Sequence, residues 1–396
     1  MKKSKKMVKK DYSKLSLAAH LKYGGKLTVA SKFKLKDKDD LSIAYTPGVA
    51  AVCMEINRDV ELARKLSLKK NTIAVVSDGS AVLGLGNIGG HGAIPVMEGK
   101  SVLMKHFADV DAFPICLNTQ DIEEIIKIIK NIEPVFGGIN LEDIAAPKCF
   151  EIEERLRAEL DIPVMHDDQW GAAVVTLSGL VNSLKVVKKK VDDIKIVVSG
   201  VGAAGIASIK LIKSYAPECK IYALDSKGLI SFTRDRLNDL NSDKKRLLAE
   251  KILEGDIDGD LSVALQNADV FVGLSKPNIL TIEMVANMNK NPIVFALANP
   301  TPEISFEDSK KANIAVFATG RSDYPNQINN SLFFPGFWRG MLNKQNKGKG
   351  KDYTVKTLHK AAEAIAKMVK PTKDKILPST LDKKVHVTVA KVVESN

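Results

Sequence analysis

The chain has 396 residues, of which 45% are hydrophobic and 27% are charged, the composition of an ordinary soluble globular protein. This length exceeds the usual size of one hydrophobic core, so we expect two domains. No run of about 18 apolar residues predicts a membrane span, and the amino terminus lacks the apolar stretch of a secretory signal. We therefore expect a cytoplasmic protein with no membrane partner.

The formal net charge is +12, and six of the lysines lie in the opening segment "MKKSKKMVKK". Such a segment predicts a disordered tail over residues 1–12; contact with nucleic acid or lipid is the alternative reading. We expect no nucleic-acid partner, because the remainder of the chain is only mildly basic. The four cysteines are scattered without metal-site or redox spacing, which favours small core residues in a reducing compartment. They are Cys53, Cys116, Cys149 and Cys219.

From residue 71, short apolar runs alternate with helical patterns, an order typical of parallel βαβ units. The predicted strands cover residues 71–78, 111–118, 134–140 and 162–168. Helical spacing predicts helices over residues 92–108, 121–132 and 149–160, the second of them capped by Asp121. We assign residues 13–165 to an N-terminal α/β domain.

A long helix over residues 171–190, rich in small residues, is placed to bridge two domains. Beyond it, a second sheet is predicted from apolar runs at residues 194–199, 220–225, 268–275, 292–300 and 312–320. We assign residues 166–342 to a Rossmann-type doubly wound domain and residues 343–396 to a lysine-rich mobile linker and a C-terminal helix around residues 354–370. The predicted fold class is α/β.

The segment "IVVSGVGAAGIA" places Gly200, Gly202 and Gly205 between a strand and a helix, the context required of a dinucleotide-binding turn. Glycines also serve tight turns and close helix packing, so the pattern alone is weak. Asp225 ends the next predicted strand and fits the acid that binds the adenosine ribose. Its charge repels a 2′-phosphate, which favours NAD over NADP, although Lys227 is placed to neutralise such a phosphate.

Two pairs of acids follow neighbouring predicted strands: Glu142 with Asp143, and Asp167 with Asp168. Parallel strands release their loops at one edge of the sheet, so these carboxylates can converge there. Oxygen ligands of this kind suit Mg²⁺ or Mn²⁺. In the alternative reading, Glu142 pairs locally and one of the later aspartates caps the long helix.

Eight ordered blocks resemble malic enzymes of the short, prokaryotic type over about residues 13–340. They are "AYTPGVA", "GLGNIGGHGAIPVMEGK", "GGINLEDI", "HDDQWGAA", "SGVGAAG", "FALANPTPE", "ATGRSDYPNQINN" and "FFPG". The resemblance implies oxidative decarboxylation of L-malate to pyruvate and CO₂, with reduction of NAD(P) and dependence on Mg²⁺ or Mn²⁺. It also suggests a homodimer with the active site near the subunit interface.

The resemblance also assigns roles to single residues. Its metal ligands are Glu142, Asp143 and Asp168, and its catalytic residues are Lys100 as general base, Tyr45 as general acid and Asp167 as proton relay. Its substrate contacts are Asn299 and Asn330, and its dinucleotide contacts are Gly200, Gly202, Ala203, Ala204, Gly205, Asp225, Ser275 and Asn299. This chain has Ala81 where larger family members carry a substrate-binding arginine, so another group must take that role.

Simpler structural readings exist for several of these residues. Lys100 also reads as a solvated helix lysine, Tyr45 as a buried ring, and Asn299 and Asn330 as turn residues. To act as a base near neutral pH, Lys100 needs a pKa about 2–3 units below 10.4, which we expect from burial and a nearby dication. The alternative function is a metal-independent 2-hydroxy acid or amino acid dehydrogenase with the same nucleotide-binding fold.

Overall fold

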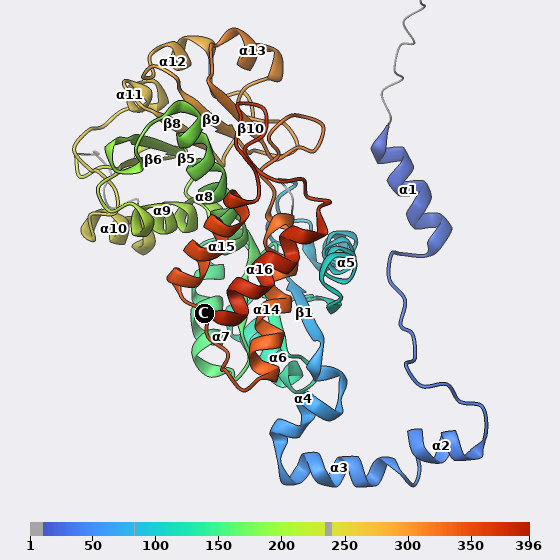
Figure 1. The fold of residues 1–396 in the computed structure, drawn as a ribbon. Helices are drawn as coiled ribbons and strands as arrows, with labels where there is room; N and C mark the ends of the chain where they lie inside the picture. The colour runs from blue at the N-terminus through green and yellow to red at the C-terminus, as the bar shows by residue number, and fades with distance from the viewer. Residues whose placement is uncertain (1–10, 83, 234–239) are drawn as a thin grey trace, which may run out of the picture.

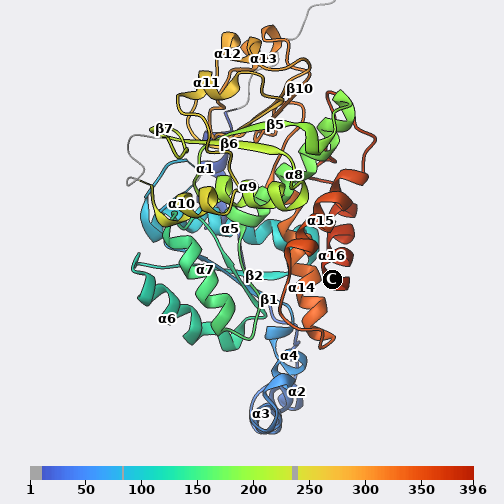
Figure 2. The same ribbon diagram turned by 90° about the vertical axis from the view of Figure 1, so that its left-hand side faces the viewer.

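The computed structural model describes residues 11–82, 84–233 and 240–396 (Figure 1). Most of the predicted tail, residues 1–10, lies outside the described residues. Asp11 accepts a hydrogen bond from the Lys14 amide and caps α1, which begins at Tyr12, so the end of the segment predicted as tail is part of a helix start. The body of the molecule is built on two sheets, one above the other in Figure 2.

The first sheet has the order β2-β1-β3-β4, and its strands are all parallel. Its strands are β1 (Thr72–Ser77), β2 (Asp111–Cys116), β3 (Gly138–Leu141) and β4 (Val164–His166). The connecting helices are α5 (Gly89–Ala108), α6 (Ile122–Ile132) and α7 (Lys148–Glu159). The predicted cap of α6 is present, since the Asp121 side chain accepts from the Glu124 amide.

Alternate residues of β1 serve the two faces of this sheet, as the pleat of a strand requires. Ala74 and Val76 pack with the apolar faces of α6 and α7. Ile73 and Val75 pack with α5 and with α14 (Phe334–Asn346), which lies on the opposite side (Figure 2). With both faces covered, the loops at the strand ends are the open part of the sheet, and ligands bind there in this architecture.

The second sheet has the order β10-β9-β8-β5-β6-β7 and is parallel except for the pair β6 and β7. Its strands are β5 (Lys195–Ser199), β6 (Lys220–Asp225), β7 (Gly228–Leu229), β8 (Val270–Gly273), β9 (Ile293–Ala296) and β10 (Val316–Thr319). Its helices are α9 (Ala203–Tyr215), α10 (Ser242–Ala249), α11 (Leu261–Leu265), α12 (Ile282–Ala286) and α13 (Phe306–Lys311). The predicted α/β fold class is confirmed, with a parallel N-terminal sheet and a Rossmann-like second sheet.

One long helix, α8 (Asp167–Val187), starts directly after β4 and packs against α9 beneath the second sheet. It is long and apolar enough to cross a membrane by length and composition alone, but two thirds of that stretch is buried inside the protein. Its small residues let neighbouring elements approach closely, and its side chains belong to a core shared with both sheets. The predicted bridge between the two halves is therefore a core helix.

Three C-terminal helices pack against the first half of the chain and against α8: α14, α15 (Val355–Lys367) and α16 (Lys383–Ser395). The segment predicted as a mobile linker begins inside α14, and its Tyr353 is buried. The domain division at residue 165/166 stays a prediction.

The N-terminal segment forms an arm of short helices that stands away from the body (Figure 1). Its helices are α1 (Tyr12–Tyr23), α2 (Lys38–Ala44), α3 (Val49–Arg58) and α4 (Ala63–Leu66). In the described part of the chain, short 3-10 helices lie at Val60–Leu62, Leu68–Lys70, Glu133–Val135, Val191–Asp193 and Asn330–Leu332. None of the four arm helices contains a buried residue, although they carry many apolar side chains.

Candidate active site

Acidic residues stand directly after three strands of the first sheet, all at its carboxyl edge. Asp78 follows β1, Glu142 and Asp143 follow β3, and Asp167 opens α8 directly after β4. β1 and β4 both pair with β3 in parallel, so the chain brings these acids to one place. The convergence expected from the parallel order of the strands is present.

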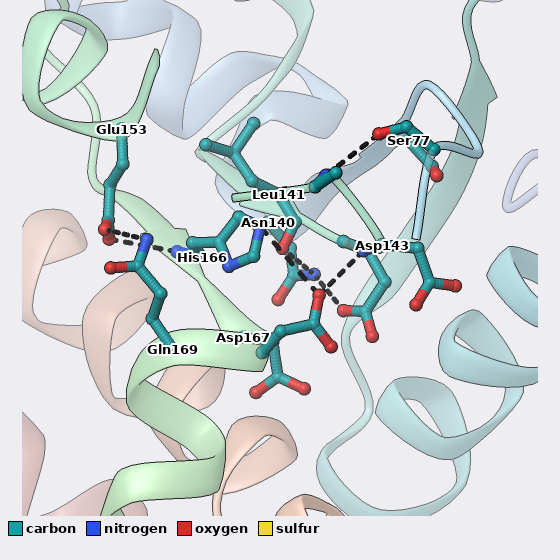
Figure 3. A network of polar contacts seen from close by, with 12 residues as sticks. Ser77, Asn140, Leu141, Asp143, Glu153, His166, Asp167 and Gln169 are labelled. Carbon is teal, nitrogen blue, oxygen red and sulfur yellow. Dashed lines mark hydrogen bonds and ion pairs between the residues drawn. The ribbon is translucent and has the colours of Figure 1, made fainter. Parts of the chain in front are cut away.

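Glu142, Asp143 and Asp168 form one cluster, in which a carboxylate oxygen of each lies within 4.8 Å of the others. The Asp143 amide donates to Asp168 Oδ2 at 2.7 Å, which ties the β3 loop to the start of α8 (Figure 3). Asp143 itself has a left-handed backbone with φ 53°, a conformation that aspartate tolerates better than most residues. Its carbonyl accepts from the Ala81 amide at 2.9 Å, so the β1 loop reaches the same point.

Lys100 supplies the positive charge that so many neighbouring acids require. Its Nζ lies 2.8 Å from Glu142 Oε1 and 2.5 Å from Asp167 Oδ2, and its side chain is only 8% exposed. It also lies over the Phe334 ring, 4.1 Å from the centroid, where a cation is attracted by the ring face. The alternative reading of a solvated helix lysine is therefore wrong.

Without a cation, the pKa of Lys100 is raised, whereas the sequence-based expectation of a lowered pKa is for a lysine beside a dication. Burial lowers its pKa, but the charges of Asp167, Glu142 and Asp168 outweigh burial and hold the pKa well above its usual value. The expected downward shift is thus absent when the lysine faces the acids alone. Lys100 is an ammonium ion in this arrangement.

The acids respond to their burial in the opposite direction. Burial raises the pKa of Glu142 to about 7 and of Asp167 to about 7, because Lys100 offsets only part of the lost hydration. Burial also raises the pKa of Asp168 to about 6. Since one ammonium ion faces several carboxylates, the cluster is short of positive charge.

Both predicted substrate asparagines lie at this edge of the sheets. Asn330 Nδ2 donates to Asp167 Oδ2 at 2.6 Å, and this links the 3-10 turn before α14 to the acidic cluster. Asn299 lies in the loop that follows β9, and its carbonyl touches the β1 loop so closely that a Cβ on Gly84 would meet it at 2.3 Å. Asn299 is therefore a contact between the loops of the two sheets.

The glycine-rich turn joins β5 to α9 as the motif requires. Gly200 has φ 107°, and a Cβ on Gly205 would lie 1.9 Å from the Gly200 carbonyl oxygen, so both positions need glycine. Gly202 precedes α9, whose first residues, Ala203 and Ala204, have amides free of intrahelical partners and suited to a pyrophosphate.

Two further predicted cofactor residues border this turn. Ser275 Oγ lies 2.9 Å from the Ser199 hydroxyl, beside the turn, while Asp225 ends β6. The Asp225 carboxylate accepts from the Lys227 amide and pairs with Lys244 Nζ at 2.8 Å. The acid predicted to meet the ribose is thus held at the end of its strand by a neighbouring cation.

Tyr45 is the predicted site residue that the structure does not bring to the cluster. It ends α2 in the N-terminal arm, and its side chain is 68% exposed. Both views place α2 beyond the amino-terminal end of β1, on the side of the first sheet opposite the acids (Figures 1 and 2). The alternative reading of a buried ring is also wrong.

The sequence reasoning missed two residues that support the cluster. Asn140 Nδ2 donates to Glu142 Oε2 at 2.9 Å, while the indole of Trp338 donates to Asn140 Oδ1 at 2.8 Å and so fixes the amide's orientation. Glu153 of α7 accepts several hydrogen bonds around the start of α8. The available signals were a polar residue within the apolar run of β3 and an acid on the apolar face of a helix.

Comparison with known proteins agrees with this architecture. The family description "Malic enzyme, N-terminal domain" matches residues 24–157, and "Malic enzyme, NAD binding domain" matches residues 170–395. The bifunctional malic/malolactic enzyme of Bacillus subtilis is 49% identical over 381 residues, which are 96% of this chain and 91% of that protein. The NAD-dependent malic enzyme of Geobacillus stearothermophilus is 51% identical over 375 residues, 93% of this chain and 76% of that protein.

A solved structure gives the same result. The crystal structure of the NAD-dependent malic enzyme of Thermotoga maritima has a TM-score of 0.91 at 46% identity and covers 96% of this chain and 98% of its own. NADP-dependent malic enzymes are also similar, among them that of Escherichia coli at 45% identity over 320 residues, 80% of this chain and 41% of that protein. Two family descriptions and relatives at these identities leave no other assignment: the chain belongs to the malic enzyme family.

Proposed function

We propose that this chain, whose family activity is the oxidative decarboxylation of malate with NAD(P), performs that reaction at the carboxyl edge of its first sheet. The observation that carries the proposal is the meeting of Glu142, Asp143 and Asp168 beside the buried Lys100. The Asn299 loop of the second, nucleotide-binding sheet touches the β1 loop at this edge. Malate bound there would lie between an acidic cluster and the nicotinamide.

The residues present fit a divalent cation. Three carboxylate groups offer oxygens within 4.8 Å of one another, the donor set that Mg²⁺ and Mn²⁺ take. Among the described residues, Asp167 Oδ1 is buried without a hydrogen-bond partner, which also favours an added positive charge. A cation held by Glu142, Asp143 and Asp168 would polarise the C2 oxygen of the substrate in both steps of the reaction.

Lys100 is the proposed proton acceptor for the C2 hydroxyl, while hydride passes from C2 to the nicotinamide. Burial lowers its pKa, while the charges of Asp167, Glu142 and Asp168 raise it; a cation held by Glu142 and Asp168 would offset part of that rise and so favour the neutral amine. Asp167, 2.5 Å from Nζ, is placed to relay the proton, and Asn330 holds the same carboxylate. The C3–C4 bond then breaks, CO₂ leaves, and C3 must receive a proton.

We propose that Tyr45 of the partner subunit donates that proton in a homodimer. The arm exposes apolar side chains that a monomer rarely leaves in water; the most exposed are Val29, Leu21, Tyr12, Tyr23, Val60 and Tyr45. Tyr45 ends α2, a helix that lies on the side of the first sheet opposite the acids, so a site completed by a second copy accounts for both observations.

For the nucleotide we propose a preference for NAD over NADP. Asp225 ends β6, the position of the acid that binds the adenosine ribose in this type of fold, and its carboxylate would accept from the 2′-hydroxyl but repel a 2′-phosphate. Lys244 shares this position and moderates the repulsion. Scattered free cysteines, two of them buried, support a reducing, cytoplasmic location.

A spectrophotometric assay with malate, NAD or NADP and Mn²⁺, followed by product analysis, tests the proposed reaction. We expect pyruvate and CO₂ in equal amounts, a larger kcat/KM with NAD, and loss of activity in excess EDTA. Accumulation of oxaloacetate as the sole product, unaffected by EDTA, would instead favour a metal-independent dehydrogenase. Sedimentation equilibrium of the same protein measures the expected dimer.

The shared site has its own test in mixtures of two inactive variants. Equal amounts of the Tyr45→Phe and Lys100→Met variants are unfolded and refolded together, or coexpressed, so that mixed dimers form. If Tyr45 completes the partner's site, each mixed dimer has one intact site, and the mixture regains about a quarter of the activity of the unsubstituted protein. If both residues act within one chain, every site keeps one defect and no activity returns.

A further inference from the structure

Glu153 is a buried carboxylate that none of the proposed catalytic steps uses. It lies on α7 and is 5% exposed, on the same face as Cys149, Ile152 and Leu156, which belong to the apolar core. Among the described residues no lysine, arginine or histidine side chain lies within ion-pair distance of it. Burial raises the pKa of Glu153, and the charges of His166 and Arg157 oppose that rise from a longer distance. A charge in an apolar core without a paired cation is costly, so hydrogen bonds must supply the rest of the compensation.

Four hydrogen-bond donors supply that compensation. Glu153 Oε1 accepts from the His166 amide at 3.0 Å and from the Tyr353 hydroxyl at 3.2 Å, and Oε2 accepts from Gln169 Nε2 at 2.9 Å. The Trp170 indole lies 2.9 Å from Oε1 and 3.1 Å from Oε2. We name these five residues the Glu153 anchor; Figure 3 shows Glu153 with His166 and Gln169.

Three of the four donors come from the start of α8. His166 is the N-cap residue of this helix, and its own side chain makes no capping hydrogen bond. The carboxylate of Glu153 accepts from the amide of this N-cap residue, and its negative charge lies near the positive end of the helix dipole. The two residues between His166 and Gln169 in the sequence are Asp167 and Asp168.

The donors require a carboxylate rather than an amide. An ionised carboxylate only accepts and has about four lone-pair positions, whereas an amide has one acceptor oxygen and two donating hydrogens. A glutamine at this position would direct its amino group at one or more of the four donors. Replacing Glu153 with glutamine therefore keeps the shape of the side chain but removes the charge and the acceptor positions that the four donors need.

We propose that Glu153 is a positioning residue for the metal ligand Asp168 and for Asp167, because it fixes the backbone from which both side chains extend. This inference rests on the proposed function, which assigns the cation to Glu142, Asp143 and Asp168. The Asp168 carboxylate must meet the β3 loop at hydrogen-bond distance, 2.7 Å from the Asp143 amide. If the start of α8 could shift, the Asp168 carboxylate would move away from the Asp143 amide, and the arrangement of the three metal ligands would be lost.

The decisive variant is Glu153→Gln, and the measurement is the Kd for Mn²⁺ alone, by isothermal titration calorimetry on the full chain without malate or nucleotide. We expect the Kd to rise about 10- to 100-fold, the usual effect of removing a group that orients a metal ligand. Tyr353→Phe is the matched control, because it removes one donor from the same carboxylate but leaves all three donors at the start of α8. Its Kd should stay within about threefold of the unsubstituted value.

A purely structural role predicts a different pattern. In that case Glu153→Gln lowers the thermal midpoint but binds Mn²⁺ as tightly as the unsubstituted protein, and the inference is wrong. If Glu153→Gln does not fold, Trp170→Phe, which deletes one α8 donor and keeps the ring's bulk, must weaken Mn²⁺ binding, and an unchanged Kd overturns the inference. Failure of the unsubstituted protein to bind Mn²⁺ would overturn the proposed metal site itself, and the inference with it.

Discussion

Replacing Lys100 with methionine tests the idea that the acidic cluster is short of positive charge. The ammonium group lies 2.8 Å from Glu142 and 2.5 Å from Asp167, and all three side chains are buried. Removing one partner of a buried ion pair costs about 3–5 kcal/mol, because the remaining charge has neither water nor a counter-ion. Lys100→Met keeps most of the side chain's apolar volume, so the loss of charge is the main change.

The expected shift in melting temperature follows from the size of the chain. Unfolding entropy is about 2.1 cal/mol/K per residue, which for 396 residues is about 0.8 kcal/mol/K. A loss of about 3–5 kcal/mol therefore lowers the midpoint in EDTA by about 4–6 °C. Protonation of a carboxylate relieves part of the cost, so the deficit should shrink as the pH is lowered from 8 to 6.

Mn²⁺ supplies the missing charge, and differential scanning calorimetry with and without the ion measures the consequence. We expect Mn²⁺ to raise the melting midpoint of Lys100→Met by more than that of the unsubstituted protein. In the variant, the bound ion also relieves the carboxylate repulsion that Lys100 no longer offsets. The activity of the variant should stay about 10²- to 10⁴-fold low, since the proposed base is absent.

The control is Lys105→Met, one helical turn further along α5. Lys105 also pairs with two acids, Asp109 and Asp111, but its side chain is 54% exposed. An exposed pair contributes about 1 kcal/mol or less, so this variant should melt within about 1 °C of the unsubstituted protein. If Lys100→Met melts like the control, or if Mn²⁺ fails to narrow its deficit, the account of the cluster's charge is refuted.

Three further predictions concern the ligands. Mn²⁺ affinity, measured by calorimetry, should weaken as the pH falls through 7, because burial raises the pKa of Glu142 to about 7 and of Asp168 to about 6 and protons then compete with the ion; affinity that is constant between pH 8 and 6 contradicts this. Gly205→Ala should weaken NAD binding at least about tenfold and leave Mn²⁺ binding unchanged, since the added Cβ meets the Gly200 carbonyl; fluorescence titration with NADH measures it. Asp225→Ser should raise the ratio of kcat/KM for NADP to that for NAD about tenfold or more, because the repelling carboxylate is gone and Lys244 remains; an unchanged ratio would move the specificity elsewhere.

The parallel arrangement of the strands and the edge that carries the site followed from local patterns in the sequence, whereas the strand order is known only from the structure. Apolar runs such as residues 71–78 are long enough only for strands, and the alternation with helices left a parallel sheet as the natural arrangement. Glu142 and Asp168 could then converge, because neighbouring parallel strands end at one edge, and the observed pairing of β3 with β4 brings them together. The arm could not be predicted in this way, since the placement of Tyr45 depends on contacts outside its own sequence neighbourhood.

The pKa of Lys100 shows what the sequence could not supply. The expected downward shift combined burial with a nearby dication, and it stays a prediction for the metal-bound site. The fold adds that Asp167 and Glu142 lie within ion-pair distance, and without the ion their charges hold the pKa above its usual value. Pair distances of this kind depend on the packing of α5 against the sheet and have no local signal.

The acidic cluster is held in place by hydrogen bonds from residues that do not bind the cation themselves. Asn140, fixed by Trp338, holds one oxygen of Glu142, while the Glu153 anchor holds the helix that bears Asp168. Carboxylates this close repel one another, so without such bonds they would turn apart and lose the geometry that a cation requires. The lysine satisfies the cluster only partly, and that remaining deficit of positive charge is what makes the same oxygens available to a divalent ion. The same deficit of positive charge therefore destabilises the metal-free site and raises its affinity for the ion. The hydrogen bond that Asn140 donates to Glu142, and those that Glu153 accepts, hold the carboxylates in place despite their repulsion.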